Sequence, residues 1–238
     1  MSLQELESDP PAHDELLFIV VHQVYELWFK QLLFELTTVR DVLFNGESAR
    51  ALHLLRRAHT IENVLIEQIP VLESMSPQDF LAFRRHLAPA SGFQSVQFRE
   101  VEFLSGLKDE RYLKRVGDHD EEKARLQRRL DEPSIWDAFV AWLERSGLPM
   151  PADDTEERRR SLVTMARERD RFPQQFDVSE ALVTHDEQFS LWRQRHILMV
   201  ERQIGSKTGT GGSTGAAYLK TTLNKRFYPE LWDLRSYL

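Results

Sequence analysis

Two histidines stand at helical spacing among apolar residues, where an imidazole can bind a metal or another buried partner. His22 lies in DELLFIVVHQVYELWFKQLLFEL (14–36), and His196 lies in RHILMVERQI (195–204). Two inward imidazoles on two long helices can line one pocket. A lone buried histidine is more often a packed core residue with one hydrogen bond, so both interpretations stay open. The neighbours that share their helix faces are apolar: Phe18, Ile19, Tyr25 and Phe29 for His22, and Phe189, Trp192, Met199 and Val200 for His196.

The motifs that the sequence lacks narrow the chemistry. There is no cysteine, which excludes disulfides, cysteine-bound zinc, iron–sulfur clusters and thiolate-bound haem. None of the eight histidines has a glutamate three residues before it, so the Glu-x-x-His pairs of di-iron bundles are absent. Neither HExxH nor GxSxG occurs. A metal held by one or two histidines remains, and haem with a neutral imidazole ligand is the leading candidate.

A glycine-rich segment follows His196 closely. GSKTGTGGSTG (205–215) contains half of the chain's ten glycines. It does not match GxxxxGK[ST] and it follows a helix rather than a strand, so a phosphate-binding loop is not indicated. One glycine is enough to end a helix, and simple termination is one interpretation. The excess of glycines favours a backbone that closes over a bound molecule, with hydroxyls from Thr208, Thr210, Ser213 and Thr214.

Two arginines lie close to apolar helix positions. Arg84 follows Phe80 by four residues, on a segment whose apolar face also includes Phe83 and Leu87. A buried guanidinium needs an anionic partner, and a bidentate contact with a substrate carboxylate would satisfy it. A protein carboxylate or an exposed position is the more common outcome. That alternative is stronger still for Arg99.

Composition indicates a folded, soluble protein. The 238 residues are 41% hydrophobic and 29% charged, and the formal net charge is −7, which argues against nucleic-acid binding as the default. No apolar run reaches about 18 residues, and the N-terminal sequence MSLQELESDPPAHDE is polar and acidic. We therefore expect neither a membrane span nor a signal peptide. The lack of cysteine fits the reducing cytoplasm, where we place the protein.

Hydrophobic periodicity is helical nearly throughout and predicts an all-α fold. No repeat or long linker divides the chain, so we expect one domain over residues 1–238. We expect helices over 14–36, 48–73, 76–87 and 93–105, then over 120–131 and from Pro133 through Leu143. The charged stretch 152–170 is a surface helix or hairpin, followed by helices over 179–204 and 214–224 and a short piece over 229–238.

Three stretches together resemble the tryptophan 2,3-dioxygenase family of haem enzymes. They are HDELLFIVVHQVYELWFKQLLFEL (13–36), MSPQDFLAFRRHLAPASGFQSVQFREVEFLSG (75–106) and WRQRHILMVERQIGSKTGTGGSTGAAYLKTTL (192–223), in the family's order. The histidine followed by the glycine-rich segment is the most specific of these signals. The resemblance implies an all-helical fold that binds b-type haem between helices, usually as a homotetramer, so we expect a dimer or tetramer.

The resemblance also assigns roles around the haem. His196 would be the proximal iron ligand, and its second ring nitrogen would need an acceptor that the sequence does not identify. His22 would be the catalytic distal histidine, placed to meet the indole N–H of tryptophan. Ser91 and Gly92 would lie against the distal face of the haem.

Four further residues would bind the substrate. By the resemblance, Phe18 and Phe80 would line the indole pocket, where the family often has tyrosine in place of Phe80. Arg84 would bind the carboxylate, and Thr210 the amino-acid head group as the glycine-rich segment closes.

The reaction implied is the cleavage of the indole C2–C3 bond of L-tryptophan by O2 to give N-formylkynurenine. Family members usually carry a further segment before HDELLF, where this sequence has only MSLQELESDPPA, so we expect the substrate lid or the subunit contacts to differ. This difference keeps open a haem monooxygenase acting on tryptophan or a substituted tryptophan in a biosynthetic pathway. A haem-binding sensor or carrier is an alternative of another class, although such a protein has no need of a carboxylate-binding arginine.

Overall fold

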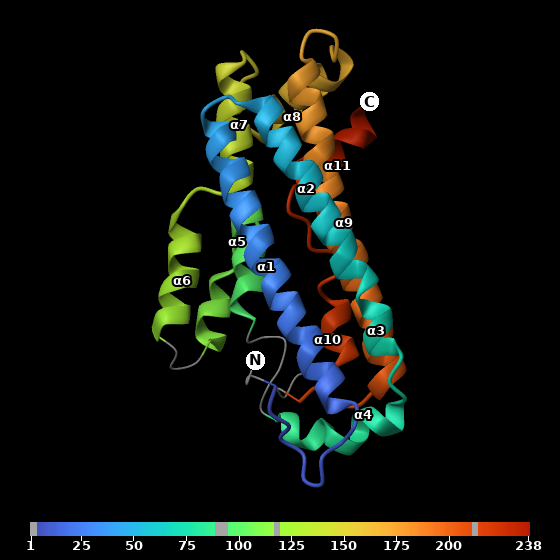
Figure 1. The fold of residues 1–238 in the computed structure, drawn as a ribbon. Coiled ribbons are helices and arrows are strands. Elements are labelled where there is room, and N and C mark those ends of the chain that lie inside the picture. Colours follow the sequence, from blue (N-terminus) through green and yellow to red (C-terminus); the bar gives the residue numbers. More distant parts are fainter. Residues whose placement is uncertain (1–3, 89–94, 117–119, 211–213) are drawn as a thin grey trace.

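The computed structural model describes residues 4–88, 95–116, 120–210 and 214–238 (Figure 1). Within these ranges all regular elements are helices, which confirms the predicted all-α fold. Three long helices dominate: α1 (Glu15–Phe44), α2 (Ser48–Glu67) and α9 (Pro173–Ile204). Helix α2 packs on both α1 and α9, and α1 also packs on α5 and α7. The predicted histidines therefore come from two helices of one bundle.

The long helices extend beyond the predicted limits. Residues 37–39 are β-branched, which lowers helix propensity, and the prediction ended α1 there. In the structure Val39 and Leu43 continue the buried stripe, so tertiary packing overrides that preference. Pro173 occupies the first turn of α9. Backbone N–H groups in the first turn have no acceptor within the helix, so a proline there costs no hydrogen bond. The helix therefore begins six residues before the predicted start at Ser179.

A proline also divides the predicted helix 48–73. Pro70 stands in the first turn of α3 (Ile69–Glu73), which follows α2 after one residue. Helix α4 (Pro77–Arg84) then begins as predicted: the Ser76 hydroxyl accepts a hydrogen bond from the N–H of Asp79 at 3.1 Å. A short 3-10 turn, η1 (Arg85–Leu87), ends it. Helix α4 thus carries Phe80 and Arg84 across the end of the bundle, beside α1 and α9 (Figure 1).

Shorter helices complete the bundle. Helix α5 (Val96–Ser105), η3 (Glu110–Arg115) and α6 (Asp120–Asp131) share a small second core of Val96, Phe103, Tyr112 and Leu126. Helix α7 (Ile135–Arg145) begins with a capping box between Ser134 and Asp137, rather than at Pro133. Helix α8 (Thr155–Arg167) lies in the charged stretch, as predicted.

The C-terminal segment returns along α9. Its elements are α10 (Ala216–Lys220), which is shorter than the predicted 214–224, then α11 (Pro229–Leu234) and η4 (Arg235–Tyr237). The buried carboxylate of Asp186 on α9 holds this segment through Oδ2. That oxygen accepts hydrogen bonds from the N–H groups of Phe227 at 2.8 Å and Tyr228 at 3.1 Å, and from Trp232 Nε1 at 2.9 Å.

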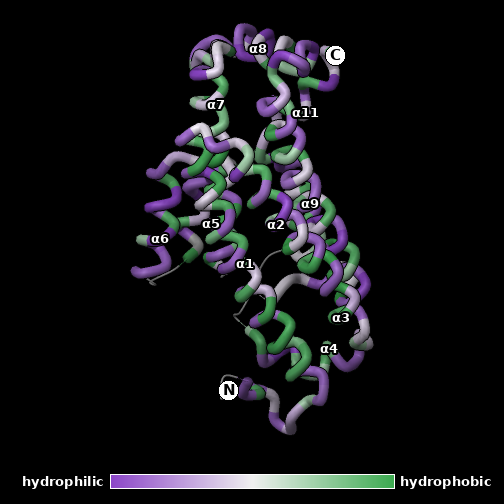
Figure 2. Tube along the Cα trace, turned by 45° about the horizontal axis from the view of Figure 1, so that its top comes forward, coloured by the Kyte–Doolittle hydropathy of each residue, from purple (hydrophilic) through white to green (hydrophobic). Residues whose placement is uncertain are grey.

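Helix α1 is apolar on two faces. One face is in the core, where Leu32, Leu36 and Leu43 are fully buried. On the other face Leu27 and Phe34, seven residues apart, are 67% and 68% exposed. Figure 2 shows hydrophobic positions recurring along this helix. By length and composition α1 is a candidate membrane span, contrary to the sequence-based expectation, but a core helix of a globular protein passes the same test.

Candidate active site

Residues predicted to act together come from three helices and one loop that meet at the α4 end of the bundle (Figure 1). Helix α1 supplies Phe18 and His22, α4 supplies Phe80 and Arg84, and α9 supplies His196. The loop between α9 and α10 contains Thr210, which is half-buried and engaged in an interaction. Ser91 and Gly92, predicted to face the haem, lie outside the described residues.

Aromatic side chains from α1 and α4 lie beside His22. The ring centroid of Phe18 lies 4.0 Å from that of His22 and 5.7 Å from that of Phe80. Phe80 meets Phe83 edge-on at 5.4 Å, with the ring planes at 90°. Phe83 is fully buried, whereas Phe18 and Phe80 keep part of their surface accessible. The buried ring therefore anchors two others that can contact a flat apolar molecule.

The hydrogen bonding of His22 defines its tautomer. Its Nδ1 lies 2.7 Å from the backbone carbonyl oxygen of Phe18, which can only accept a hydrogen bond. Nδ1 therefore carries the proton, and in the neutral ring Nε2 is the nitrogen that can accept a hydrogen bond. Desolvation lowers the pKa of His22, against opposing effects of the Phe18 carbonyl and the Glu26 carboxylate. His22 is thus neutral at pH 7 and can accept a hydrogen bond from an N–H group.

The His22 ring combines two properties that differ from those of a packed core histidine. Its surface is accessible to solvent, yet enough protein surrounds it for desolvation to be the largest influence on its pKa. The accessible surface of the ring shows that a ligand can reach it.

His196 faces the same region from α9. Desolvation, followed by the charge of His22, lowers its pKa to about 4, so the two imidazoles lie close enough to interact electrostatically. The indole of Trp192, one turn earlier on α9, stacks on the His196 ring at a centroid distance of 5.1 Å with the planes 4° apart. Among the described residues no hydrogen bond to the His196 ring is found, and its expected acceptor stays a prediction.

These donors fit haem better than a protein-only metal site. The described residues contain no cluster of three or more histidine, cysteine, aspartate or glutamate side chains that could hold a metal ion. They instead place a neutral imidazole on each of two helices, α1 and α9, close enough for the rings to interact electrostatically and beside flat apolar side chains. An iron already held by four porphyrin nitrogens needs only one such protein ligand. His196, with its ring stacked on Trp192, suits that position.

The two arginines differ in their partners. Arg84 is half-buried, and its Nη2 donates to the backbone carbonyl of Thr208; no carboxylate pairs with it in the described chain. Arg99 is buried, pairs with Glu102 at 2.5 Å and lies 4.0 Å from the ring centroid of Tyr112. Arg99 therefore has a protein carboxylate as its partner, the outcome that its sequence position favoured. Arg84 retains donors for a carboxylate.

The glycine-rich loop folds back on itself. Gly205, with φ +58°, ends α9, and Gly215, with φ +63°, precedes α10. A Cβ atom at Gly215 would clash with the carbonyl oxygen of Lys207, whereas a Cβ at Gly205 would meet open space. An ion pair of 2.6 Å between Lys220 and Glu201 joins the helices on either side. The first part of the loop is held against Arg84 through Thr208, so glycine does more here than end a helix.

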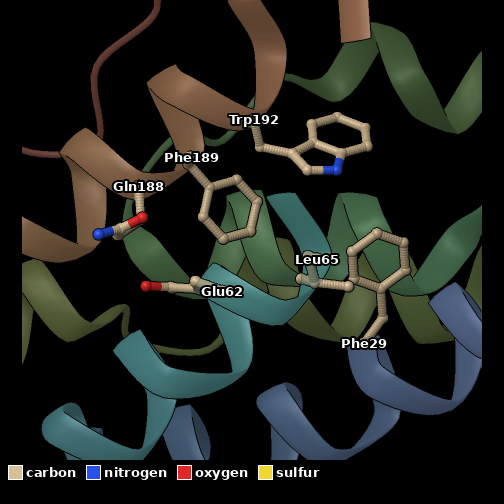
Figure 3. A pocket seen from close by; sticks show the side chains of 6 residues that line it. All are labelled: Phe29, Glu62, Leu65, Gln188, Phe189 and Trp192. Atoms are coloured by element: carbon tan, nitrogen blue, oxygen red, sulfur yellow. The ribbon is translucent and has the colours of Figure 1, made fainter. Parts of the chain in front are cut away.

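A small cavity lies behind Trp192 (Figure 3). Its volume is about 10 Å³, enough for one water molecule and too small for a substrate. Figure 3 shows Glu62 and Gln188 at one side of it and Trp192 with Phe29 at the other. Glu62 Oε2 and Gln188 Oε1 have no hydrogen-bond partner in the described ranges. The cavity therefore lies in the packing between α1, α2 and α9, and it is not a substrate pocket.

The fold and the site define an all-α protein with a two-histidine site suited to haem. The chain belongs to the tryptophan 2,3-dioxygenase family: the family profile described as Tryptophan 2,3-dioxygenase matches residues 1–157 and 155–238. A tryptophan 2,3-dioxygenase of a Nocardioides species is 57% identical over 243 residues, covering 100% of this chain and 90% of the relative. Those of Herpetosiphon aurantiacus and Caulobacter vibrioides are 45% and 39% identical, covering 99% and 100% of this chain and 93% and 94% of the relatives. The resemblance seen in the sequence is confirmed.

Proposed function

We propose that this protein is a haem-dependent dioxygenase that cleaves the indole C2–C3 bond of L-tryptophan with O2 and forms N-formylkynurenine. The observation that carries the proposal is the pair of neutral, electrostatically interacting imidazoles: His196, stacked on Trp192, and His22, whose Nε2 can accept a hydrogen bond. Membership in the family supports the same reaction. Bound haem b supplies the oxygen activation, and His196 is the residue that holds its iron.

His22 orients the indole. The indole N–H can only donate, and the neutral His22 ring offers Nε2 as the acceptor because Nδ1–H is committed to the Phe18 carbonyl. This contact fixes the rotation of the indole in its own plane. Phe18 and Phe80 contact its faces and exclude water, which strengthens the hydrogen bond inside the site. The catalytic role of His22 is thus to hold, and if required to accept, the indole proton at Nε2.

Arg84 and the glycine-rich loop bind the amino-acid part of the substrate. The guanidinium has five N–H donors, and its Nη2 contacts the Thr208 carbonyl. The remaining donors suit a carboxylate in bidentate geometry. Thr210, two residues beyond Thr208, binds the ammonium end as the loop covers it. Ser91 and Gly92 are proposed to lie against the distal face of the haem.

The enzyme acts as a homo-oligomer, a dimer or tetramer, in the cytoplasm. Support comes from the exposed stripe on α1, where Val20, Leu27 and Phe34 recur every seven residues outside the core. A second copy of the chain can cover these side chains, and the seven-residue spacing suits packing against another helix. The lack of cysteine fits a reducing compartment.

The function is tested by haem binding and turnover of the purified protein. We expect a Soret band from bound haem and conversion of L-tryptophan to N-formylkynurenine after reduction. His196→Ala should lose stable haem binding, whereas His22→Ala should keep the haem and alter turnover. A protein that cannot take up haem, or one that takes it up and turns over no indole amino acid, would contradict the proposal.

A further inference from the structure

Glu26 forms a hydrogen-bonded connection between α1 and α5, one turn after His22. Its carboxylate accepts from the Ser95 hydroxyl at Oε1 (2.5 Å) and from Gln97 Nε2 at Oε2 (2.7 Å). The same Gln97 nitrogen donates to the backbone carbonyl of Glu26 at 2.9 Å. Three hydrogen bonds therefore link one turn of α1 to two residues about 70 positions later in the chain.

The connection reaches the first turn of α5. Ser95 is the N-cap of this helix, and its hydroxyl also accepts from the N–H of Phe98 at 3.2 Å. The negative charge of Glu26 thus lies at the positive end of the α5 dipole, where it is stabilising. Hydrogen bonds to an ionised carboxylate are stronger than those between neutral groups, so this contact fixes where α5 begins relative to α1.

The same turn of α5 contacts Trp192, the residue that stacks on His196. Phe98 is buried, and its ring centroid lies 5.2 Å from Trp192 and 5.6 Å from Phe29. Trp192 in turn stacks on His196. A continuous path of contacts therefore leads from the His22 turn of α1, through the first turn of α5, to the His196 turn of α9.

We propose that Glu26 is a positioning residue that sets the placement of His22 relative to His196 by holding the first turn of α5 between α1 and α9. The inference rests on the proposed function, because it assumes that the separation of these two histidines matters for the reaction. Glu26 itself has no contact with the substrate in this account. It acts through Gln97 and Phe98.

The chain offers a direct test, because the connection is a carboxylate–amide pair that can be reversed. Glu26→Gln keeps the size of the side chain but leaves two amides facing each other. The double variant Glu26→Gln/Gln97→Glu restores one carboxylate and one amide in swapped positions. Gln97→Ala removes the amide and leaves Glu26 intact, and it serves if Glu26→Gln folds poorly. Glu187→Gln, an exposed glutamate on α9, is the matched control.

Hydrogen exchange gives a readout that needs neither haem nor turnover. In Glu26→Gln the amides of residues 96–99 should exchange about tenfold faster or more, since charge-assisted hydrogen bonds are lost. The swapped pair should recover most of the protection, and Glu187→Gln should match the unmodified protein. Unchanged exchange in both Glu26→Gln and Gln97→Ala would overturn the proposal.

Steady-state kinetics separate positioning from general loss of structure. For Glu26→Gln we expect kcat to fall about tenfold, less than the hundredfold that a misplacement of about 1 Å can cause, with KM for L-tryptophan within twofold. The swapped pair should return kcat to within about threefold of the unmodified enzyme. Failure of the swap to restore kcat would contradict the proposal. Lack of turnover by the unmodified protein would instead refute the proposed function and leave the exchange result to decide the connection.

Discussion

The indole of Trp192 lies parallel to the imidazole of His196, with 5.1 Å between the ring centroids and 4° between the planes. The two residues are one helical turn apart on α9, so the helix itself sets their spacing. Tyr25 and Phe98 contact the other parts of the indole, at centroid distances of 6.2 and 5.2 Å. The orientation of the proposed iron ligand is thus fixed by packing, since no hydrogen bond to its ring is found in the described residues.

Replacing Trp192 should weaken haem retention. Aromatic pairs contribute about 0.5–1.5 kcal/mol beyond area burial, so Trp192→Leu should speed haem dissociation by roughly 2- to 12-fold. Trp192→Phe keeps a ring at this position and should show a smaller effect. Transfer of haem to an excess of apomyoglobin measures the rate. Equal rates in the leucine variant and the unmodified protein would show that stacking does not hold the ligand.

Low pH should destabilise the haem-free protein through His196. The folded protein has a His196 pKa of about 4, against the ordinary value of 6.5. Between these values the unfolded chain binds more protons than the folded one, so stability is fully present above pH 6.5 and falls as the pH is lowered toward 4. Because part of the His196 residue remains accessible to solvent, which screens the charged form, we expect a loss of about 1–2 kcal/mol from this residue.

Urea unfolding at pH 7.5 and pH 4.5 measures this dependence. The haem-free His196→Leu variant lacks the titrating group and should lose less stability over the same interval. His22, whose pKa is also lowered, acts in the same direction and should account for part of what remains. An identical pH dependence in the variant and the unmodified protein would be inconsistent with a neutral, desolvated His196.

Arg84→Gln should raise KM for L-tryptophan and reduce the preference for substrates that carry a carboxylate. Loss of one partner of a charge-assisted contact costs about 2–5 kcal/mol, which corresponds to roughly 30-fold or more in affinity. Tryptamine has no carboxylate, so its weaker binding should be nearly unaffected. Arg85→Gln, at the adjacent exposed position, is the control. The assignment fails if the variant still prefers L-tryptophan over tryptamine by the original factor.

Two glycines allow a matched test of the loop. Gly205 and Gly215 have nearly the same φ, +58° and +63°, but only Gly215 lies against the Lys207 carbonyl. Both alanine variants should lose about 1–3 kcal/mol from backbone strain, because a positive φ with ψ of −127° and −132° is a conformation that only glycine adopts readily. Only Gly215→Ala should displace the loop, which should raise KM for L-tryptophan and speed trypsin cleavage after Lys207. Equal behaviour of the two variants would mean that the close approach has no role in placing the loop.

Asp186→Asn should destabilise the protein without affecting haem binding. The carboxylate of Asp186 accepts three hydrogen bonds that fasten the start of α11 and Trp232 to α9. Its loss should lower the free energy of unfolding by about 2–4 kcal/mol, since these hydrogen bonds are buried and charge-assisted. Asp233→Asn, at an exposed position on α11, should change it by less than about 0.5 kcal/mol. Urea unfolding of both variants gives the comparison.

Hydrophobic spacing and capping residues predicted most helices. They did not predict features that depend on contacts between residues far apart in the sequence. The apolar spacing and Ser76-Pro77 located α1 and the start of α4, whereas the continuation of α1 past Leu36 depends on burial against other helices. The proposed site residues followed from the family resemblance. Glu26 is only a polar position on α1 until α5 is placed beside it, because its partners are about 70 residues away. The partner of Arg84 is a backbone carbonyl, which has no sequence signature.

The proposed reaction inserts both atoms of O2 into L-tryptophan. The haem-loaded protein is reduced without oxygen, mixed with L-tryptophan and exposed to ¹⁸O2, and the product is analysed by mass spectrometry. We expect N-formylkynurenine carrying two ¹⁸O atoms, with far less product from His22→Ala at equal haem content. A hydroxylated indole or oxindole carrying one ¹⁸O atom would contradict it and identify a monooxygenase.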